Sequence, residues 1–373
     1  MLIGIPKEIK TNENRVGLTP ESVHEVVHHG HTVIVETGAG LGIGKTDDDY
    51  LNAGASIVDT ASEVFAKAEM IVKVKEPQKI EYEQLRADQI LFTYLHLSPD
   101  PAQTQGLMDS GCIAVAYETV TNPHGGLPLL APMSEVAGRM ATQVGAYHLQ
   151  KLNGGLGALL GAVPGVEASK VVVLGGGVAG LNATKMAVGL GAEVVVLDRN
   201  VERLRYLDDV FNGRVKTIFS TAHAVEQHCT TADLVIGTVL IPGANAPKLI
   251  TNAILQKMKK GAVIVDVAID QGGCTDVSKP TTHAQPTFVA NDVVVYCVAN
   301  MPGGVPLTST FALNNATLPF VLSIADKGIK QALLQDEHLL NGLNVCQGKM
   351  TCQAVAQAQN IAFTDAKEAA TAL

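Results

Sequence analysis

The chain has 373 residues, of which 47% are hydrophobic and only 17% are charged, so it is long enough for two α/β domains that each bury a core. A net charge of −9, with no Lys/Arg cluster interleaved with aromatic residues, argues against nucleic-acid binding. The low charge content favours an oligomer, although a large buried core would also produce it.

The N-terminal sequence contains neither a basic leader nor a long apolar stretch, so we expect a first strand and a cytoplasmic protein rather than a secretory signal. The most apolar region, from Gly154 to Gly165, is interrupted by glycines, and no transmembrane helix is predicted. Six scattered cysteines form no CxxC pair. This pattern predicts reduced, mostly buried thiols rather than a zinc site, a redox dithiol or a disulfide framework.

The first part of the chain alternates short apolar runs with helical or loop stretches, which is typical of βαβ units. A helix is predicted to start at Pro20 with Thr19 as its N-cap. The predicted strands are Leu2–Ile5, Thr32–Glu36, Met70–Val74, Gln89–Leu95 and Cys112–Tyr117.

A long helix is predicted to begin at Ser134 and to reach toward Leu152, joining the first block to a second one with a parallel-sheet rhythm. Beyond Leu307 we expect helices only, which return to the first block. The sequence therefore predicts an α/β protein of two doubly wound domains: a discontinuous domain from residues 1–132 and 305–373, and a dinucleotide-binding domain from residues 133–304. In the second block, the first expected strand starts at Val171. The others are Glu193–Leu197, Val215–Phe219, Asp233–Gly237, Ala262–Asp266 and Asp292–Val298.

A glycine-rich turn follows the apolar run Lys170–Leu174 and precedes a predicted helix. Its glycines, Gly175, Gly177 and Gly180, have the GxGxxG spacing of a dinucleotide phosphate cradle, in which free N–H groups and the helix dipole favour pyrophosphate. The next apolar strand ends in Asp198, at the separation where a carboxylate accepts the hydroxyls of an adenosine ribose. The two features together predict a dinucleotide site.

Polar residues end several apolar runs, and ligands of doubly wound sheets bind outside the carboxyl ends of strands. Lys75, His96, Glu118 and Asp270 occupy such positions and would line one rim. Glu118 is expected to cap a neighbouring backbone segment or to form an ion pair.

Each of the other three residues, and Arg15 as well, has a structural alternative. Lys73 and Lys75 alternate with valines, which is typical of the solvated face of an edge strand. His96 could be bonded to a loop carbonyl, Asp270 could cap the turn that follows it, and Arg15 lies in a polar loop where an arginine commonly faces solvent.

Four histidines, His24, His28, His29 and His31, fall close together in the sequence. His24 and His28 have helical i, i+4 spacing, but no nearby carboxylate pattern indicates a metal. No metal site is predicted.

Several motifs resemble the family of alanine dehydrogenase and the NAD(P) transhydrogenase α-subunit, and the resemblance covers essentially the whole chain. They are Ile3–Glu8, Glu13–Pro20, Val74–Pro77, Tyr94–Leu97, Pro132–Gly138 and Gly175–Gly180. The combination of Lys75, His96 and Asp270 resembles alanine dehydrogenase in particular.

The resemblance implies NAD-dependent, reversible oxidative deamination of L-alanine to pyruvate and ammonium without a metal. By resemblance, Arg15 and Lys75 bind the substrate carboxylate, His96 is the acid/base, and Asp270 supports the reacting centre. The residue types suit these tasks, because a guanidinium offers a planar fork to a carboxylate and an imidazole exchanges protons near neutral pH.

The resemblance also implies a set of cofactor-binding residues and a homohexamer with an N-terminal substrate domain completed by the C-terminal helices. Asp198 favours NAD over NADP, because a 2′-phosphate would meet a carboxylate, but Arg199 and Arg203 are close enough in sequence to neutralise that repulsion, so NADP stays open. Besides the three glycines and Asp198, the implied NAD contacts are Ser134, Val178, Arg203, Ser220, Val239, Leu240 and Met301.

Two other functions are open at this point: a soluble transhydrogenase-like NAD(H)-binding subunit, and a nucleotide-binding module without turnover. The sequence leaves undetermined the strictness for alanine, the physiological direction, and the division of proton transfer between His96 and Asp270.

Overall fold

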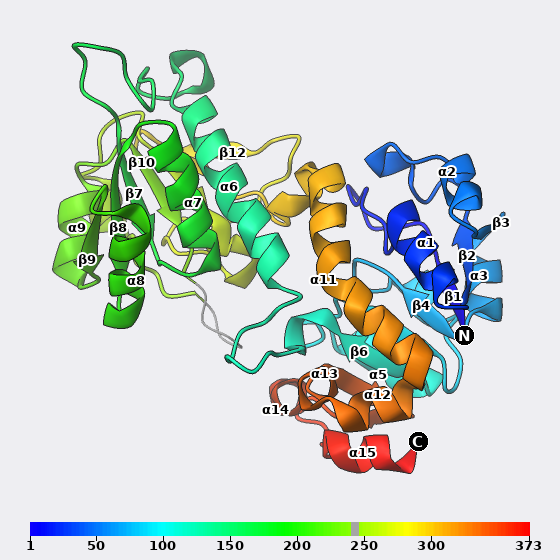
Figure 1. Cartoon of the computed structure of the whole chain (residues 1–373). Coiled ribbons are helices and arrows are strands. Elements are labelled where there is room, and N and C mark those ends of the chain that lie inside the picture. Colours follow the sequence, from blue (N-terminus) through cyan, green and yellow to red (C-terminus); the bar gives the residue numbers. More distant parts are fainter. Residues whose placement is uncertain (240–245) are drawn as a thin grey trace. The chain divides into compact units, whose positions relative to one another are not determined.

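The computed structural model describes residues 1–239 and 246–373. The chain divides into two compact units, one made of Met1–Met133 and Val305–Leu373 and the other of Ser134–Gly304. Figure 1 labels the elements of both units along the chain. In each unit helices flank a sheet that is parallel except at one edge, so the predicted α/β class with two doubly wound domains is confirmed.

Unit 1 contains an eight-stranded sheet in the order β15-β14-β6-β5-β4-β1-β2-β3. The strands β1 to β6 are parallel, whereas β14 runs antiparallel to β6 and to β15. The strands are β1 (Leu2–Ile5), β2 (Thr32–Glu36), β3 (Ser56–Val58), β4 (Met70–Val72), β5 (Ile90–Thr93), β6 (Ile113–Ala116), β14 (Leu343–Cys346) and β15 (Lys349–Met350).

The helices of unit 1 come from both stretches of chain, and α1 and α11 contact one another. Thr19 caps α1 as predicted, since its side chain accepts from the Ser22 N–H. The helices are α1 (Pro20–His28), α2 (Asp47–Asn52), α3 (Ala61–Lys67), α4 (Lys79–Tyr82), α5 (Pro101–Ser110), α11 (Pro306–Lys327), α12 (Ile329–Gln335), α13 (Glu337–Leu340), α14 (Gln353–Gln359) and α15 (Ala366–Ala372), with 3₁₀ turns at Leu41–Ile43 (η1) and Tyr117–Thr119 (η2).

Unit 2 contains a seven-stranded sheet in the order β12-β13-β11-β10-β7-β8-β9, parallel except for the edge strand β12. The strands are β7 (Lys170–Leu174), β8 (Glu193–Asp198), β9 (Val215–Phe219), β10 (Leu234–Gly237), β11 (Val263–Asp266), β12 (Thr287–Ala290) and β13 (Val293–Tyr296). The helices and turns are α6 (Ala131–His148), α7 (Val178–Gly189), α8 (Val201–Phe211), α9 (Ala222–Cys229), α10 (Asn252–Leu255), η3 (Lys151–Asn153), η4 (Val267–Gln271) and η5 (Met301–Gly304).

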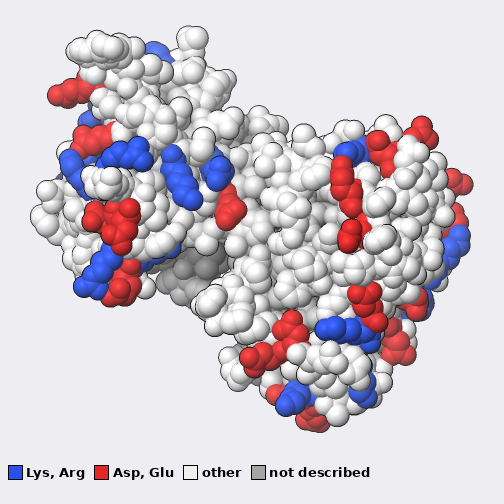
Figure 2. All heavy atoms as spheres, in the orientation of Figure 1, with Lys and Arg blue, Asp and Glu red and all other residues white. Residues whose placement is uncertain are grey.

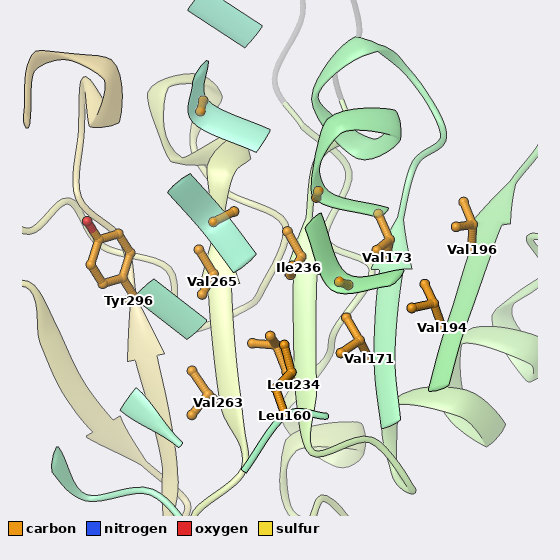
Figure 3. Packing of buried hydrophobic residues seen from close by; sticks show 14 of the residues in the cluster. Leu160, Val171, Val173, Val194, Val196, Leu234, Ile236, Val263, Val265 and Tyr296 are labelled. Atoms are coloured by element: carbon orange, nitrogen blue, oxygen red, sulfur yellow. The ribbon is translucent and has the colours of Figure 1, made fainter. Parts of the chain in front are cut away.

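The valine-rich strands of unit 2 are buried on both faces, which explains their continuous apolar runs. Figure 3 shows one face, on which alternate residues such as Val171, Val173 and Val265 pack together. Alanines of α6 and α7 join this cluster, whereas Val172, Val195 and their neighbours pack on the other face with α9 and α10. The sheet therefore has a core on each side.

Three predictions about elements are wrong. The helix α6 begins at Ala131 rather than at Ser134, because a proline such as Pro132 is tolerated in the first helical turn, where its missing N–H would have no helical partner. The helix also ends earlier than predicted, at His148 rather than near Leu152. The C-terminal part is not helical throughout, since β14 and β15 extend the sheet of unit 1.

Five of the six cysteines are buried, Cys352 is half-buried, and all are free thiols, as predicted. In the described part of the chain, no helix combines the length and apolarity needed to cross a bilayer. Acidic and basic side chains are interspersed on the visible face of each unit (Figure 2).

Candidate functional site

In unit 1, the candidate residues follow four neighbouring parallel strands. The loops after β1, β4, β5 and β6 carry Arg15, Lys75, His96 and Glu118, respectively. Register between the strands places their carboxyl ends at one edge, because Val72 pairs with Phe92 and Thr93 with Ala116. The sheet itself thus gathers these side chains from sequence positions about a hundred residues apart.

Arg15 is buried, with 2% of its surface exposed, so its interpretation as a solvent-facing loop arginine is wrong. Its Nε and Nη2 each donate to the Glu13 carboxylate at 2.6 Å, and Nη1 lies 3.1 Å from the Met133 Sδ. Burial disfavours the guanidinium charge, but the bonds to Glu13 outweigh it and raise the pKa of Arg15. The guanidinium group of Arg15 is therefore charged and is held in one orientation.

Lys73 and Lys75 do not lie on an edge strand, because β4 pairs with β1 on one side and β5 on the other. The Lys73 side chain is fully buried, and its Nζ lies 3.1 Å from Glu8 and 2.6 Å from Glu81. Glu8 also accepts the backbone N–H groups of Val74, at 2.7 Å, and Lys75, at 3.3 Å. A buried ionic cluster thus fixes the backbone that presents Lys75.

Lys75 is half-buried, and its carbonyl accepts the Thr93 hydroxyl at 2.9 Å. Burial raises the pKa of Glu8, although Lys73 opposes this shift. The supporting roles of Glu8, Glu13 and Glu81 were not predicted from the sequence. Glu8 and Glu13 lie in the motifs Ile3–Glu8 and Glu13–Pro20, which could have drawn attention to them. The residues that they bind could be named only from the fold.

His96 has a left-handed backbone, with φ of 49°, and an imidazole stacked on the Tyr94 ring at 5.7 Å between centroids and 3° between planes. Its side chain is 44% exposed. Glu118, predicted to cap or pair, accepts the His96 N–H at 2.6 Å. Burial raises the pKa of Tyr94, so this phenol stays protonated.

In unit 2, the glycine turn lies between β7 and α7. Gly175 has φ of 98°, a conformation that favours glycine, and a Cβ on Gly180 would lie 1.9 Å from the Gly175 carbonyl oxygen. Gly177 is the N-cap of α7 and supplies no side-chain acceptor. The turn thus has the close backbone approach and the open helix start that a pyrophosphate requires.

Asp198 ends β8 beside this turn. Its Oδ2 accepts the Gly176 N–H at 2.6 Å, and its Oδ1 accepts the Asn200 N–H at 2.8 Å. Arg203 donates to the carbonyl oxygens of Gly176 and Gly177. The carboxylate and the guanidinium therefore brace the turn from β8 and α8.

The remaining cofactor candidates lie on or after other elements of unit 2. Ser220 follows β9, and its N–H donates to the Asp198 carbonyl at 2.9 Å. Val239 follows β10, Met301 begins η5, Ser134 lies within α6, and Val178 begins α7. Leu240 lies outside the described residues.

Asp270 is an exposed residue in η4, and its Oδ1 accepts the Asn300 N–H at 3.2 Å. The bond of Asp270 is thus to Asn300 rather than to the turn that follows it, and the N-cap of η4 is buried Asp266, which accepts from the Ala268 N–H at 3.1 Å. Burial raises the pKa of Asp266. Among the described residues, no group of three or more His, Cys, Asp or Glu is placed to hold a metal ion.

The fold and these sites define an α/β protein with a dinucleotide-type glycine turn and a second sheet that presents cationic side chains. The models of the alanine dehydrogenase/PNT N-terminal and C-terminal domains match residues 4–137 and 141–353. The chain therefore belongs to the alanine dehydrogenase/PNT family.

Individual relatives are similar over nearly the whole chain. An alanine dehydrogenase of Halomonas elongata is 57% identical over 98% of this chain and 99% of its own length, and one of Mycolicibacterium smegmatis is 53% identical over 99% of both. A solved L-alanine dehydrogenase has a TM-score of 0.94 and 51% identity, covering 96% of this chain and 99% of its own. A transhydrogenase from Sinorhizobium meliloti has a TM-score of 0.82 and 26% identity, covering 95% and 100%.

Proposed function

We propose that this chain is an NAD-dependent L-alanine dehydrogenase, which converts L-alanine, water and NAD⁺ reversibly into pyruvate, ammonium and NADH. The observation that carries the proposal is the cationic edge of the sheet in unit 1, where Arg15 is buried in a fixed orientation and Lys75 follows the adjacent strand. Hydride transfer between two nicotinamides needs no clamp for a small carboxylate, so this edge favours the amino-acid enzyme over a transhydrogenase-like subunit.

The described residues around the glycine turn fit NAD. The open start of α7 suits the pyrophosphate, and Asp198 suits ribose hydroxyls while disfavouring a 2′-phosphate. When bound, the nicotinamide supplies the hydride acceptor. We assign contacts with NAD to Ser134, Gly175, Gly177, Val178, Gly180, Asp198, Arg203, Ser220, Val239, Leu240 and Met301.

The substrate carboxylate is bound by Arg15 and Lys75 in this proposal. The planar guanidinium fixes the plane of the carboxylate and Lys75 adds a point charge, so that Cα takes one orientation. Orientation matters because a substrate with a single methyl side chain offers few other groups to hold.

His96 exchanges the protons of the reaction. It takes a proton from the ammonium group, so that the nitrogen lone pair assists departure of the hydride, and it serves again when water attacks the resulting iminium carbon. Asp270 is proposed to polarise that water and to offset the positive charge that develops on the substrate.

An assay of NADH formation with a panel of L-amino acids and both cofactors tests the proposal. We expect turnover with L-alanine and NAD, and the reverse reaction with pyruvate and ammonium. Hydride exchange between two nicotinamides without an amino acid would indicate the transhydrogenase-like function, and NADH binding without any turnover would indicate a binding module.

We further propose that the enzyme is cytoplasmic and assembles as a homohexamer. The low charge content supports extensive contacts between copies.

A further inference from the structure

Glu118 makes an unusual contact with the loop that carries His96. Its Oε1 accepts the His96 N–H at 2.6 Å and the Leu95 N–H at 3.1 Å, and its Oε2 lies 3.2 Å from the same Leu95 nitrogen. Glu118 lies in η2, directly after β6, and the loop follows the paired strand β5. One carboxylate therefore binds two consecutive backbone donors of the neighbouring strand end.

His96, which provides one of these two donors, has a left-handed backbone with φ of 49°. A non-glycine residue in this region costs free energy and persists only where its surroundings fix it. Successive N–H groups that point to one side form a concave anion site, and a carboxylate there favours the conformation. The hydrogen bonds to the Glu118 carboxylate are thus contacts that favour this strained conformation.

The same carboxylate lies beside the imidazole. Glu118 Oε1 is 3.9 Å from His96 Nδ1. The imidazole ring also stacks on the ring of Tyr94. Tyr94 in turn packs edge-on against Tyr117, the residue before Glu118, with centroids 5.1 Å apart. Backbone and ring of His96 are therefore both fixed from η2.

We propose that Glu118 is a positioning residue for His96, which sets the orientation of the imidazole for proton exchange with the substrate. The inference rests on the proposed function, in which His96 is the acid/base. A group misplaced by about 1 Å costs about 100-fold in rate, so loss of this contact should reach the chemistry even though Glu118 itself moves no proton.

A plain capping role is the alternative, and the chain offers a matched control for it. Asp365 also accepts two consecutive backbone N–H groups, those of Lys367 and Glu368, at 2.9 and 3.0 Å. Asp365 caps α15, and neither Asp365 nor the two residues that it binds belong to the site described above.

The test compares Glu118→Ala with Glu118→Gln, whose amide oxygen can still accept both N–H groups. We expect Glu118→Ala to lower kcat with L-alanine by about 10- to 100-fold and to leave the Kd for NADH unchanged. Glu118→Gln should recover most of that loss, and Asp365→Ala should keep the kcat of the wild type. If Glu118→Ala does not fold, Glu118→Met, which keeps the length of the side chain without its oxygens, replaces it.

A double-mutant cycle with His96→Ala separates positioning from structure. Because Glu118 acts through the imidazole, Glu118→Ala should cause no further loss of the residual turnover in the His96→Ala background. Losses that multiply, a wild-type kcat in Glu118→Ala, or a Gln variant as impaired as the Ala variant would overturn the inference. So would loss of folding in both Ala and Met variants beside a fully active Gln variant, because that pattern indicates a structural role. A wild-type chain without alanine turnover would instead overturn the proposed function, and this inference with it.

Discussion

At the level of single residues, a buried carboxylate supports each of the two residues proposed to bind the substrate carboxylate, Arg15 and Lys75. Glu13 binds the guanidinium of Arg15, and Glu8 binds the backbone of Lys75. By charge alone, these carboxylates oppose binding of an anion at the proposed substrate-carboxylate site. Their benefit is orientation, because a buried fork with two of its nitrogens bonded cannot rotate.

Removal of the Arg15 side chain should therefore damage both binding and stability. We expect Arg15→Ala to raise the KM for pyruvate and to lower the free energy of unfolding by about 3 kcal/mol, since it leaves Glu13 buried without its main partner. Steady-state kinetics and urea unfolding measure the two effects. Arg205→Ala is the matched control, because its pair with Glu202 is exposed and should be worth less than about 1 kcal/mol. Equal effects of the two substitutions would contradict the role of burial.

The same pair predicts a pH dependence of stability. Burial alone would raise the pKa of Glu13, but the bonds to Arg15 outweigh it and lower this pKa below its ordinary value. A depressed folded-state pKa contributes stability above the unfolded value, and that contribution is lost as the pH falls through the folded value. Glu13→Gln should therefore flatten the decline in unfolding free energy below about pH 4.5. Urea midpoints measured from pH 6 to pH 3 check this, and parallel curves for the variant and wild type would contradict it.

How far the site could be predicted from sequence differs from residue to residue. The positions of Lys75 and His96 after two strands could be predicted, because polar residues that end apolar runs are visible in the sequence. The burial of Lys73 could not be predicted. Its alternation with valines is also typical of an edge strand, and its partner Glu8 lies 65 positions away. Burial of a charge depends on which strands are neighbours, and a local pattern does not contain that information.

At the element scale, the turn from β7 to α7 requires glycine for a specific contact. A Cβ on Gly180 would lie 1.9 Å from the Gly175 carbonyl oxygen, whereas a Cβ on Gly189, at the other end of α7, meets nothing within 4 Å. Gly180→Ala should lower the affinity for NADH by more than about tenfold, because the helix start must move away from the strand. Gly189→Ala should leave affinity unchanged and be neutral or stabilising by about 0.5–1 kcal/mol. Fluorescence titration and thermal unfolding distinguish these outcomes, and equal behaviour would argue against the close approach.

The end of β8 should determine the choice of cofactor. Asp198→Gly should relax discrimination against NADP, but it also removes the acceptor for the Gly176 N–H. Asp198→Asn keeps an acceptor oxygen while removing the charge, so it should raise the ratio of kcat/KM for NADP to that for NAD with less damage to the turn. Asp209→Asn, exposed on α8, is the control. A ratio that does not change in either Asp198 variant would show that the ribose is recognised elsewhere.

Elements were predictable where local signals and tertiary pairing agree. The strands β7 and β8 have long valine runs, and α1 has its Thr-Pro start. The strand β14 was missed because Asn344 interrupts its apolar run; this amide is buried and satisfied by the Thr119 hydroxyl and the Gly342 carbonyl. The three-residue strand β3 and the edge strand β12 are formed by pairing with neighbours rather than by a strong pattern of their own.

At the scale of the whole molecule, the surface of unit 2 is unusually apolar in one stretch. Leu152 is 99% exposed, Leu159 67% and Val166 64%. Scattered apolar residues on a surface need no explanation, but several within fifteen positions are typical of a contact surface. The low charge content of the whole chain points in the same direction.

For the proposed homohexamer, we expect light scattering after size exclusion to give about six times the 39.1 kDa mass of the chain. Its unfolding temperature should also rise with protein concentration, because association stabilises the folded state by mass action. Leu152→Asp, placed in the apolar stretch, should lower the mass, and Leu41→Asp, at an exposed leucine of unit 1, serves as the comparison. A mass near that of one chain at micromolar concentration, with an unfolding temperature independent of concentration, would show that the apolar stretch has another use.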